Sequence, residues 1–136
     1  MPLLVLRSVS SVQIGVKSSS NLPITLTTPH HQLMDKIATL SEILTVDPTN
    51  AFARYGLAME HNTRGNTDLA LTEFTALIHH NPDYVPAYQM SAQTLAKLGR
   101  TQEAVTRLND GLAAAKRTNN AHAASEMQAL LDDLRA

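Results

Sequence analysis

The 136-residue sequence contains no cysteine and no tryptophan, and its only aromatic residues are two Phe and three Tyr. Without cysteine, disulfide bonds, thiolate zinc sites and cysteine nucleophiles are excluded. No apolar run approaches the roughly 20 residues that a membrane span needs, so we expect no membrane partner. With a net charge of −1, the protein has no overall electrostatic attraction to nucleic acid, so we do not expect nucleic acid as a partner.

Acidic residues are also missing from the start of the chain. Residues 1–33 hold Arg7 and Lys17 but no Asp or Glu, whereas the rest holds nine basic and all twelve acidic residues. The same segment is rich in Ser and Thr and shows no helical period. We therefore predict a poorly ordered N-terminal tail over residues 1–33 and a structured domain over residues 34–136.

Three interpretations of this tail compete. A secretory signal is disfavoured, because Arg7 interrupts a short apolar start and no small-residue cleavage site follows. An acid-free, serine-rich segment is typical of an organelle transit peptide, although two basic residues give that interpretation little weight. We favour a tail or upstream extension of a protein whose natural start is Met34, and we expect a cytoplasmic protein, with organelle import as the open alternative.

From Met34 onward, apolar residues recur with the period of an α-helix, and turn signals such as DPTN, RGN and NPDY separate the runs. Asn50, Asn66, Asp83 and Thr101 stand at or beside the expected helix starts, where they can cap free amides. The pattern predicts helices over residues 35–46, 51–64, 67–80, 84–98, 101–117 and 121–134.

The turn signals and the residues after them recur along the chain. The segment GNTDLALTEF, residues 65–74, recurs as GRTQEAVTRL, residues 99–108. Five pairs of positions match at the same offset of 34 residues, which indicates a repeat array: Pro48 and Pro82, Ala58 and Ala92, Gly65 and Gly99, Ala70 and Ala104, Phe74 and Leu108.

This pattern resembles the tetratricopeptide repeat family, whose unit is two antiparallel helices in 34 residues. The resemblance implies an all-α fold, a short right-handed α-solenoid of antiparallel helix pairs, with repeats at residues 51–84 and 85–118 between two flanking helices. Three positions depart from the family pattern: Arg54 at the usual Trp position, Ser91 in place of a leucine and Lys116 in place of the closing proline. The last of these leaves the end of the second repeat open, so its final helix could run on.

No motif for chemistry emerges from the sequence. His79 and His80 point about 100° apart on a helix and cannot easily share one ion. His122 and Glu126 are spaced i, i+4, but two ligands do not make a metal site, and a surface pair is the better interpretation. There is no phosphate loop, HExxH or GxSxG motif. We predict no metal, no cofactor and no enzyme.

The resemblance instead implies a binding surface, because the first helix of each pair lines a concave groove in this family. Carried over residue by residue, the groove comprises Phe52, Tyr55, Met59, Asn62, Thr63, Gln89, Gln93, Lys97 and Met127. Some family members hold a peptide's C-terminal carboxylate in this groove with Lys, Asn and Arg side chains. Here Tyr55, Met59 and Met90 occupy matching positions, so that clamp is absent.

The sequence thus predicts a non-catalytic interaction module or scaffold that binds a protein or peptide of unknown identity in a concave groove. Self-association into a homodimer is the structural alternative. An enzyme with a scattered site is a weak third.

The small residues yield a first prediction. Ala104 is small, we infer, because a neighbouring helix presses on it, so Ala104→Leu should overpack the contact and lower the free energy of unfolding by about 1–3 kcal/mol. At a solvent-facing position the change would be nearly neutral, since leucine is almost as good a helix former as alanine. An unchanged midpoint in chemical denaturation would contradict the packing inference.

Overall fold

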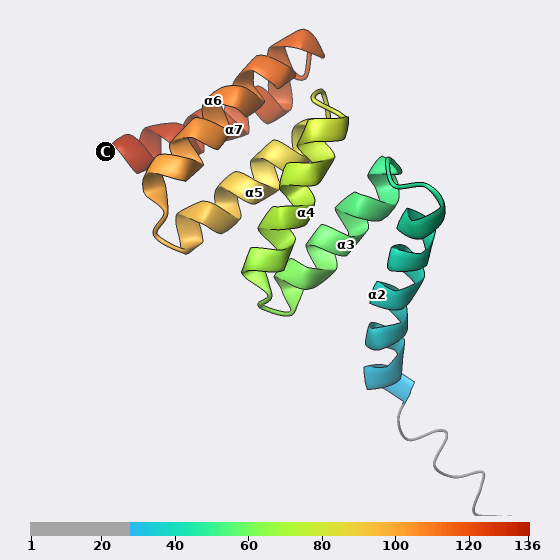
Figure 1. Ribbon diagram of the computed structural model, residues 1–136. Helices are drawn as coiled ribbons and strands as arrows, with labels where there is room; N and C mark the ends of the chain where they lie inside the picture. The colour runs from blue at the N-terminus through green and yellow to red at the C-terminus, as the bar shows by residue number, and fades with distance from the viewer. Residues whose placement is uncertain (1–27) are drawn as a thin grey trace, which may run out of the picture. The chain divides into compact units, whose positions relative to one another are not determined.

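The computed structural model describes the backbone of residues 28–136 and the side chains of residues 36–136 (Figure 1). Most of the predicted tail therefore lies outside the described residues. The chain divides into two units, residues 1–38 and 39–136. Of the first unit, only helical residues 28–38 are described, and the packing reported below is that of the second.

Every regular element in the described part of the chain is an α-helix. From α3 onward, the predicted boundaries are correct to within one residue. The first helix begins at Thr28 instead of residue 35, because Pro29 falls in its first turn, where its missing N–H costs no hydrogen bond. The helices are α2 (Thr28–Val46), α3 (Ala51–Thr63), α4 (Thr67–His80), α5 (Val85–Lys97), α6 (Thr101–Arg117) and α7 (Ala121–Arg135).

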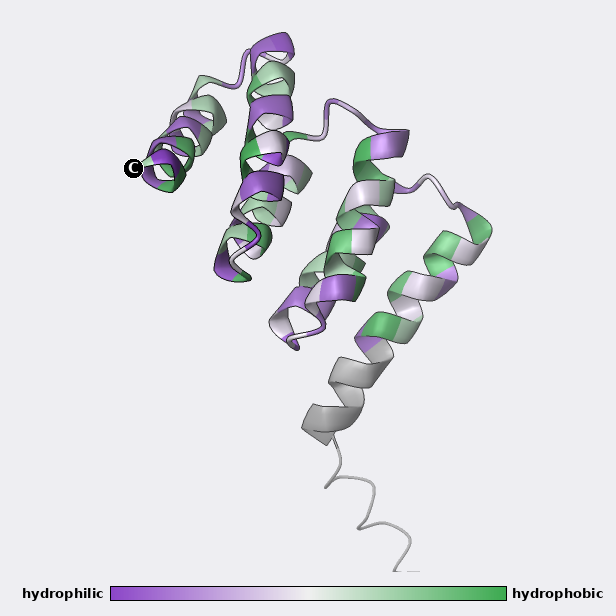
Figure 2. Ribbon diagram, turned by 60° about the vertical axis from the view of Figure 1, so that its left-hand side comes forward, coloured by the Kyte–Doolittle hydropathy of each residue, from purple (hydrophilic) through white to green (hydrophobic). Residues whose placement is uncertain are grey.

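Consecutive helices pack as antiparallel pairs, α3 with α4 and α5 with α6, and α7 packs on α6 and α5 (Figures 1 and 2). We call the side formed by α3, α5 and α7 the inner face and the side formed by α4 and α6 the outer face. Buried apolar residues of neighbouring helices pack into shared clusters, and Figure 2 shows hydrophobic and hydrophilic residues alternating along the helices. The predicted all-α helical repeat solenoid is confirmed.

Small residues lie where the helices approach each other most closely. The four alanines predicted at helix contacts, Ala58, Ala70, Ala92 and Ala104, are all 0% exposed. Larger side chains fill the space beside them: Phe74 packs with Ala58 and Ala70, and Leu108 packs with Ala92. The repeated positions therefore form the core, as the 34-residue spacing predicts.

Three turns use a left-handed residue to end a helix. Gly65 and Gly99 have φ values of +83° and +77°, and Asn119 adopts φ +56° after α6. In each case the next residue donates a backbone hydrogen bond back into the final turn, at 2.8–2.9 Å, as in a Schellman motif. Helix α6 runs on to Arg117, whereas the residue equivalent to the end of α4 is Ala114. With Lys116 in place of proline, nothing stops the helix earlier.

Only one of the four expected capping side chains makes a capping bond. Asn50 accepts a hydrogen bond from the Ala53 amide at 2.9 Å, whereas Asn66 makes none, and α5 and α6 have Tyr84 and Arg100 at their N-caps. Asp83 and Thr101 were wrong as caps because each lies one residue away from the cap position.

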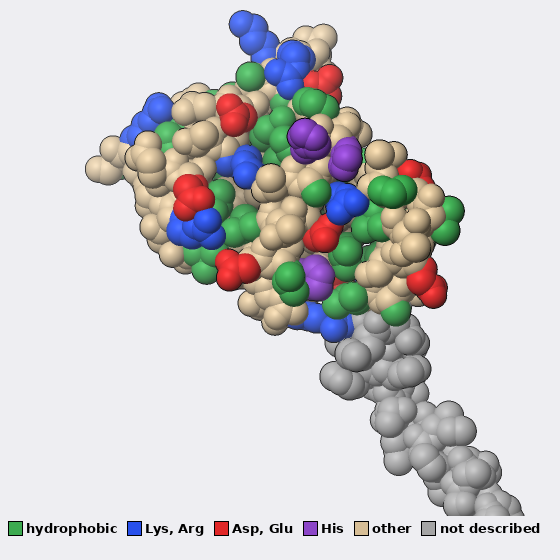
Figure 3. Space-filling view, viewed as in Figure 1, with side chains coloured by type: hydrophobic (Ala, Val, Ile, Leu, Met, Phe, Trp, Pro, Cys, Tyr) green, Lys and Arg blue, Asp and Glu red, His purple; other side chains and the backbone are tan. Residues whose placement is uncertain are grey.

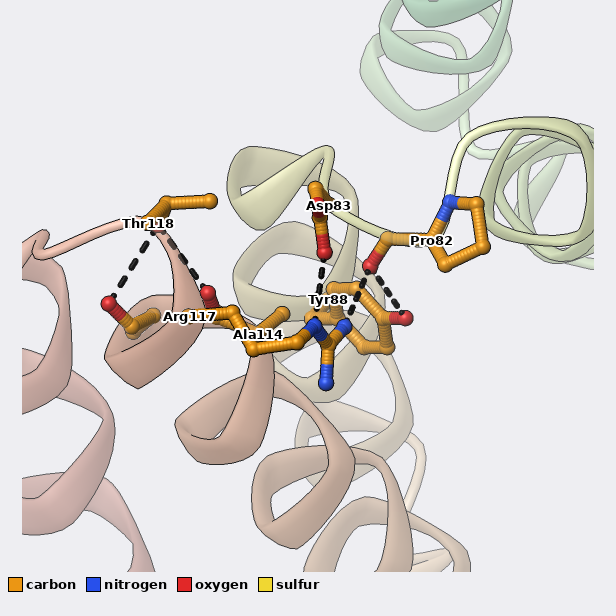
Figure 4. A network of polar contacts seen from close by, with 7 residues as sticks. Pro82, Asp83, Tyr88, Ala114, Arg117 and Thr118 are labelled. Carbon is orange, nitrogen blue, oxygen red and sulfur yellow. Dashed lines mark hydrogen bonds and ion pairs between the residues drawn. The ribbon is translucent and has the colours of Figure 1, made fainter.

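Before each helix pair, the carbonyl of a proline accepts a hydrogen bond from a side chain in the first helix of that pair. The Tyr88 hydroxyl donates to the Pro82 carbonyl at 2.8 Å, and Arg117 donates to the same carbonyl at 3.1 Å and to Asp83 Oδ1 at 2.8 Å (Figure 4). One repeat earlier, Arg54 Nη2 donates to the Pro48 carbonyl at 2.7 Å. Arg54, a departure from the family pattern, thus makes the same contact as Tyr88 with a different side chain.

Gly111 supplies a further close contact. A Cβ atom at this position would lie 2.7 Å from both Met127 Sδ and Tyr88 Cβ, closer than van der Waals contact allows. Glycine therefore permits α5, α6 and α7 to meet there, although it weakens the interior of α6 by about 1 kcal/mol relative to alanine.

We predict that Gly111→Ala lowers the free energy of unfolding by about 1–3 kcal/mol, because overpacking exceeds the gain in helix propensity. Urea denaturation of the two proteins measures the difference. Ala113→Gly, at an exposed position of the same helix, is the control for propensity alone and should cost about 1 kcal/mol. A more stable Gly111→Ala protein would show that the three helices have room to spare.

Candidate functional site

Four half-buried apolar side chains lie together on the inner face. Tyr55 and Met59 come from α3, Met90 comes from α5, and Tyr84 is the residue before α5; all four pack against the buried cluster that contains Phe74. We call these four residues the aromatic–methionine row. Aromatic rings and thioethers that are anchored from below and open to solvent above are suited to contact a partner's apolar side chains.

Tyr55 is the most firmly held member of the row. Its ring lies 5.5 Å from that of Tyr84 and 6.0 Å from that of Phe74, both in tilted arrangements. Burial raises the pKa of the Tyr55 phenol, and the nearby Tyr84 raises it further. The side chain is therefore at once part of the core and part of the surface, which is a refinement of the predicted groove position.

Polar side chains flank the row and join neighbouring helices. Asn62 Oδ1 accepts a hydrogen bond from Thr94 Oγ1 at 3.3 Å, which links α3 to α5. Gln89 Nε2 donates to Glu126 Oε1 at 3.2 Å, which links α5 to α7. Gln93 is half-buried on α5. These amides belong to α3 and α5, the helices that carry Tyr55, Met59 and Met90 of the row.

Three predicted groove residues are exposed. Phe52, at the start of α3, is 79% exposed. Thr63 and Lys97 lie at the ends of α3 and α5, and the Thr63 hydroxyl donates to the Met59 carbonyl of its own helix at 2.9 Å. All three side chains are accessible to a partner, although Thr63 and Lys97 lie at the edge of the helical layer.

Met127 is not a surface residue. It is 0% exposed and belongs to the buried cluster with Tyr88, Leu108 and Leu131. The physical reason is Gly111, whose missing side chain leaves the space that the Met127 sulfur fills. As the terminal helix, α7 uses its apolar face to cover the array, so Met127 is withdrawn from the groove.

The structure adds residues that the sequence did not single out for the site. Tyr84 completes the aromatic pair, and Thr94 and Glu126 bond Asn62 and Gln89. Tyr84 directly precedes α5 and comes two residues after Pro82; the sequence pattern placed it both as the last residue of the NPDY turn signal and as the first residue of the predicted helix 84–98. An aromatic residue in a turn otherwise rich in polar residues was the available signal.

The histidines form no metal site within the described part of the chain, where no three ligating side chains come together. His122 Nε2 lies 2.7 Å from Glu126 Oε2 on the surface of α7, so this pair is an exposed contact. The His79 and His80 rings meet edge to face at the end of α4. None of the helices that the structure describes has the length and hydrophobicity required for crossing a membrane.

The buried phenol of Tyr55 predicts a pH effect. A raised pKa means that folding favours the neutral phenol, so this stabilisation is complete below about pH 10 and is lost as the pH rises through the higher pKa of the folded state. Tyr55→Phe cannot ionise and should lose less stability between neutral and alkaline pH in urea denaturation. Tyr88, whose pKa burial also raises, provides the same background in both proteins. Equal losses would show that Tyr55 is solvated.

Comparisons with known proteins agree with this architecture. The chain is similar to a tetratricopeptide repeat domain protein from Salinibacter ruber, with 32% identity and a TM-score of 0.61 over 65% of this chain and 89% of that one. It is also similar to the TPR2B domain of yeast Sti1 in complex with pHsp70, with 16% identity and a TM-score of 0.70 over 82% and 89% of the two chains.

A third similar structure is PcrH in complex with the chaperone binding region of PopD, with 15% identity and a TM-score of 0.71 over 82% of this chain and 84% of that one. No curated protein matches the sequence. The tetratricopeptide repeat family model matches residues 62–131, which is more than half of the chain. With this match, two helix pairs in 34-residue register and a terminal covering helix, the chain belongs to the tetratricopeptide repeat family.

Proposed function

We propose that this protein is a non-catalytic interaction module that holds a peptide or helix of a partner protein across its inner face. The observation that carries the proposal is the aromatic–methionine row, a half-exposed apolar strip supported by the core and flanked by amide groups. A partner's apolar side chains would cover the rings and sulfurs, and its backbone would bond the amides. The compartment we propose is the cytoplasm, as expected from the sequence.

The geometry of the row favours tight contact at low entropic cost. Tyr55 and Tyr84 hold each other at 5.5 Å, so neither ring has to be ordered when a partner binds. Met59 and Met90 are flexible and can adjust to the shape of a partner side chain. The yeast Sti1 domain and PcrH, which share this fold, were both solved with a bound partner. The fold is therefore able to present such a surface.

A phage-displayed library of random peptides tests the proposal without knowledge of the natural partner. Peptides selected on the wild-type protein are measured by titration calorimetry. Met59→Ala should weaken binding by about 1–3 kcal/mol, the free energy of removing a large apolar side chain from water. Gln93→Ala should cost only about 0.5–1.5 kcal/mol, as expected for an exposed neutral hydrogen bond.

Matched controls come from the outer face. Leu69→Ala removes a side chain that is 52% exposed on α4, and Asn109→Ala removes an exposed amide on α6. Both should bind the selected peptides like the wild type. We use Met59 in preference to Tyr55, because truncating Tyr55 would also disturb its contacts with Phe74 and Tyr84. Loss of binding in the controls, with none in Met59→Ala, would move the site to the outer face.

Self-association is the second candidate, and one observation favours it. Val46, at the end of α2, and Phe52, near the start of α3, are 87% and 79% exposed, and burial of such side chains would stabilise a dimer. Sedimentation equilibrium of Val46→Ser/Phe52→Ser against the wild type separates the candidates. A wild-type protein that is monomeric at all concentrations rules the dimer out.

A further inference from the structure

A second candidate site lies on the outer face, between α4 and α6. A cavity of about 340 Å³ opens there, which is within the size range of small-molecule sites. Leu71 and Leu95 form its buried floor, and the hydroxyl residues Thr75 and Thr106 line it together with Arg107. The outer face as a whole mixes basic, acidic and apolar side chains and shows no large patch of one charge (Figure 3). Any recognition of charge here therefore depends on individual side chains.

Arg107 is a half-buried cation without an acidic partner. Its Nη1 donates to Ser91 Oγ at 2.9 Å and its Nη2 donates to Thr75 Oγ1 at 3.3 Å. Both acceptors are neutral hydroxyls, and three of the five guanidinium N–H groups remain for other acceptors. Among the described side chains, the arginines in ion pairs are Arg54, Arg64, Arg100 and Arg117.

Burial also affects the charge of this side chain. Desolvation lowers the pKa of Arg107, and the attraction of Asp110, Tyr88 and Glu103 is too weak to reverse the effect. A desolvated cation whose hydrogen-bond acceptors are neutral hydroxyls is costly, and a charged acceptor in direct contact would relieve that cost.

In the first helix pair, the positions equivalent to Ser91 and Arg107 hold residues with purely structural contacts. Thirty-four residues before Ser91 and Arg107 stand Leu57 and Glu73. Leu57 is buried, and Glu73 accepts a hydrogen bond from Arg54 at 2.6 Å, so the acid is paired. In the second pair, Ser91 replaces the leucine and its hydroxyl accepts from the guanidinium of Arg107, which replaces the acid. Tyr88 occupies the position equivalent to Arg54, so this pair has no matching ion pair. The unpaired cation is specific to this repeat.

We propose that Arg107 and this cavity bind a carboxylate carried on a small apolar body. The free guanidinium N–H groups match the two oxygens of a carboxylate, Thr75 supplies a hydroxyl, and Leu71 and Leu95 cover the apolar part. The Thr106 hydroxyl also lines the cavity, but it donates to the Gln102 carbonyl of its own helix at 3.1 Å. Arg100 lies at the rim, but Glu103 already occupies it through two hydrogen bonds of 2.7 Å each. Arg107 is therefore the anchor of the site.

The charges around the cavity select this ligand over a phosphate. Glu103 and Asp110 also line the cavity, so its two basic and two acidic side chains balance. A dianionic phosphate would be repelled by both acids and would find no use for the leucine floor. A carboxylate with an aliphatic chain carries a single negative charge, which Arg107 attracts, and its chain can be buried against Leu71 and Leu95. The carboxylate could come from a free organic acid or from the C-terminus of a peptide.

Chemical-shift titration of the full chain by NMR tests the proposal, with hexanoate as the probe. Hexanoate should give saturable shifts of the Thr75, Thr106 and Arg107 signals. Hexanamide, which has the same shape without the charge, and inorganic phosphate should shift these signals by a far smaller amount at equal concentration. Acetyl-alanyl-leucine and its C-terminal amide distinguish the sources: saturable binding of the dipeptide acid in addition to hexanoate, with none of its amide, assigns the site to a peptide terminus, and binding of hexanoate without the dipeptide acid assigns it to a small acid.

Three variants identify the anchor. Arg107→Gln should weaken hexanoate binding at least about tenfold, because a charge-assisted hydrogen bond is worth about 1.5–3 kcal/mol. Ser91→Ala frees one guanidinium donor and should retain or tighten binding. Arg135→Gln, at an exposed position outside the cavity, is the charge-matched control and should bind like the wild type.

The proposal fails if hexanoate produces no saturable shift in the wild type, or if phosphate or hexanamide binds equally well. It also fails if Arg107→Gln keeps wild-type affinity, since Arg107 would then be a bridge between Ser91 and Thr75 only. Met59→Ala, on the inner face, should leave hexanoate binding unchanged, so the outcome is separable from that of the proposed peptide site.

Discussion

The close approach of helices at residues without a large side chain is the constraint from which the rest of this structure follows. Ala58, Ala70, Ala92 and Ala104 are completely buried because each stands where one helix presses on the next. Gly111 takes the same principle to its limit. Once the backbones are this close, the directions of the helices and the places left for Phe74 and Leu108 are largely determined. The inner and outer faces are consequences of that packing.

Much of the fold could be predicted from the sequence, because the same residue pattern occurs in both repeats. Matching Gly65 with Gly99 and Ala70 with Ala104 was enough to position α3 to α6. What the sequence did not reveal was the identity of single contacts. Two of the four capping residues, Asp83 and Thr101, were assigned one residue too early and one residue too late, respectively, since neighbouring polar residues are equally good candidates until the backbone is known. Met127 was placed in the groove by its register, because nothing in the sequence of α7 shows that Gly111 has left a space for it.

For the inner face, the sequence indicated which helices carry the residues but not the contacts that each side chain makes. Tyr55 and Met59 are half-buried on α3, and Tyr55 is in ring contact with Tyr84, which comes from outside its own helix. The Thr94 and Glu126 partners of Asn62 and Gln89 come from other helices and depend on distances that only the fold supplies. On the outer face, the sequence did show that Ser91 departs from the repeat. It could not show that Arg107, far along another helix, fills the space left by that change.

The proline contacts have a mechanical consequence. At the second corner, Arg117 joins the end of α6 to Pro82 and Asp83, one full repeat behind it. The equivalent positions at the first corner are Asp83 and Thr49, and these offer no cation; Thr49 bonds only to Asp47 nearby. The cation at the first corner comes from the first helix of the pair instead: Arg54 of α3 bonds the Pro48 carbonyl and is itself paired with Glu73 of α4. The two corners are therefore tied by arginines from opposite helices of a pair, α3 at the first and α6 at the second, so that loss of either arginine would free a different helix end.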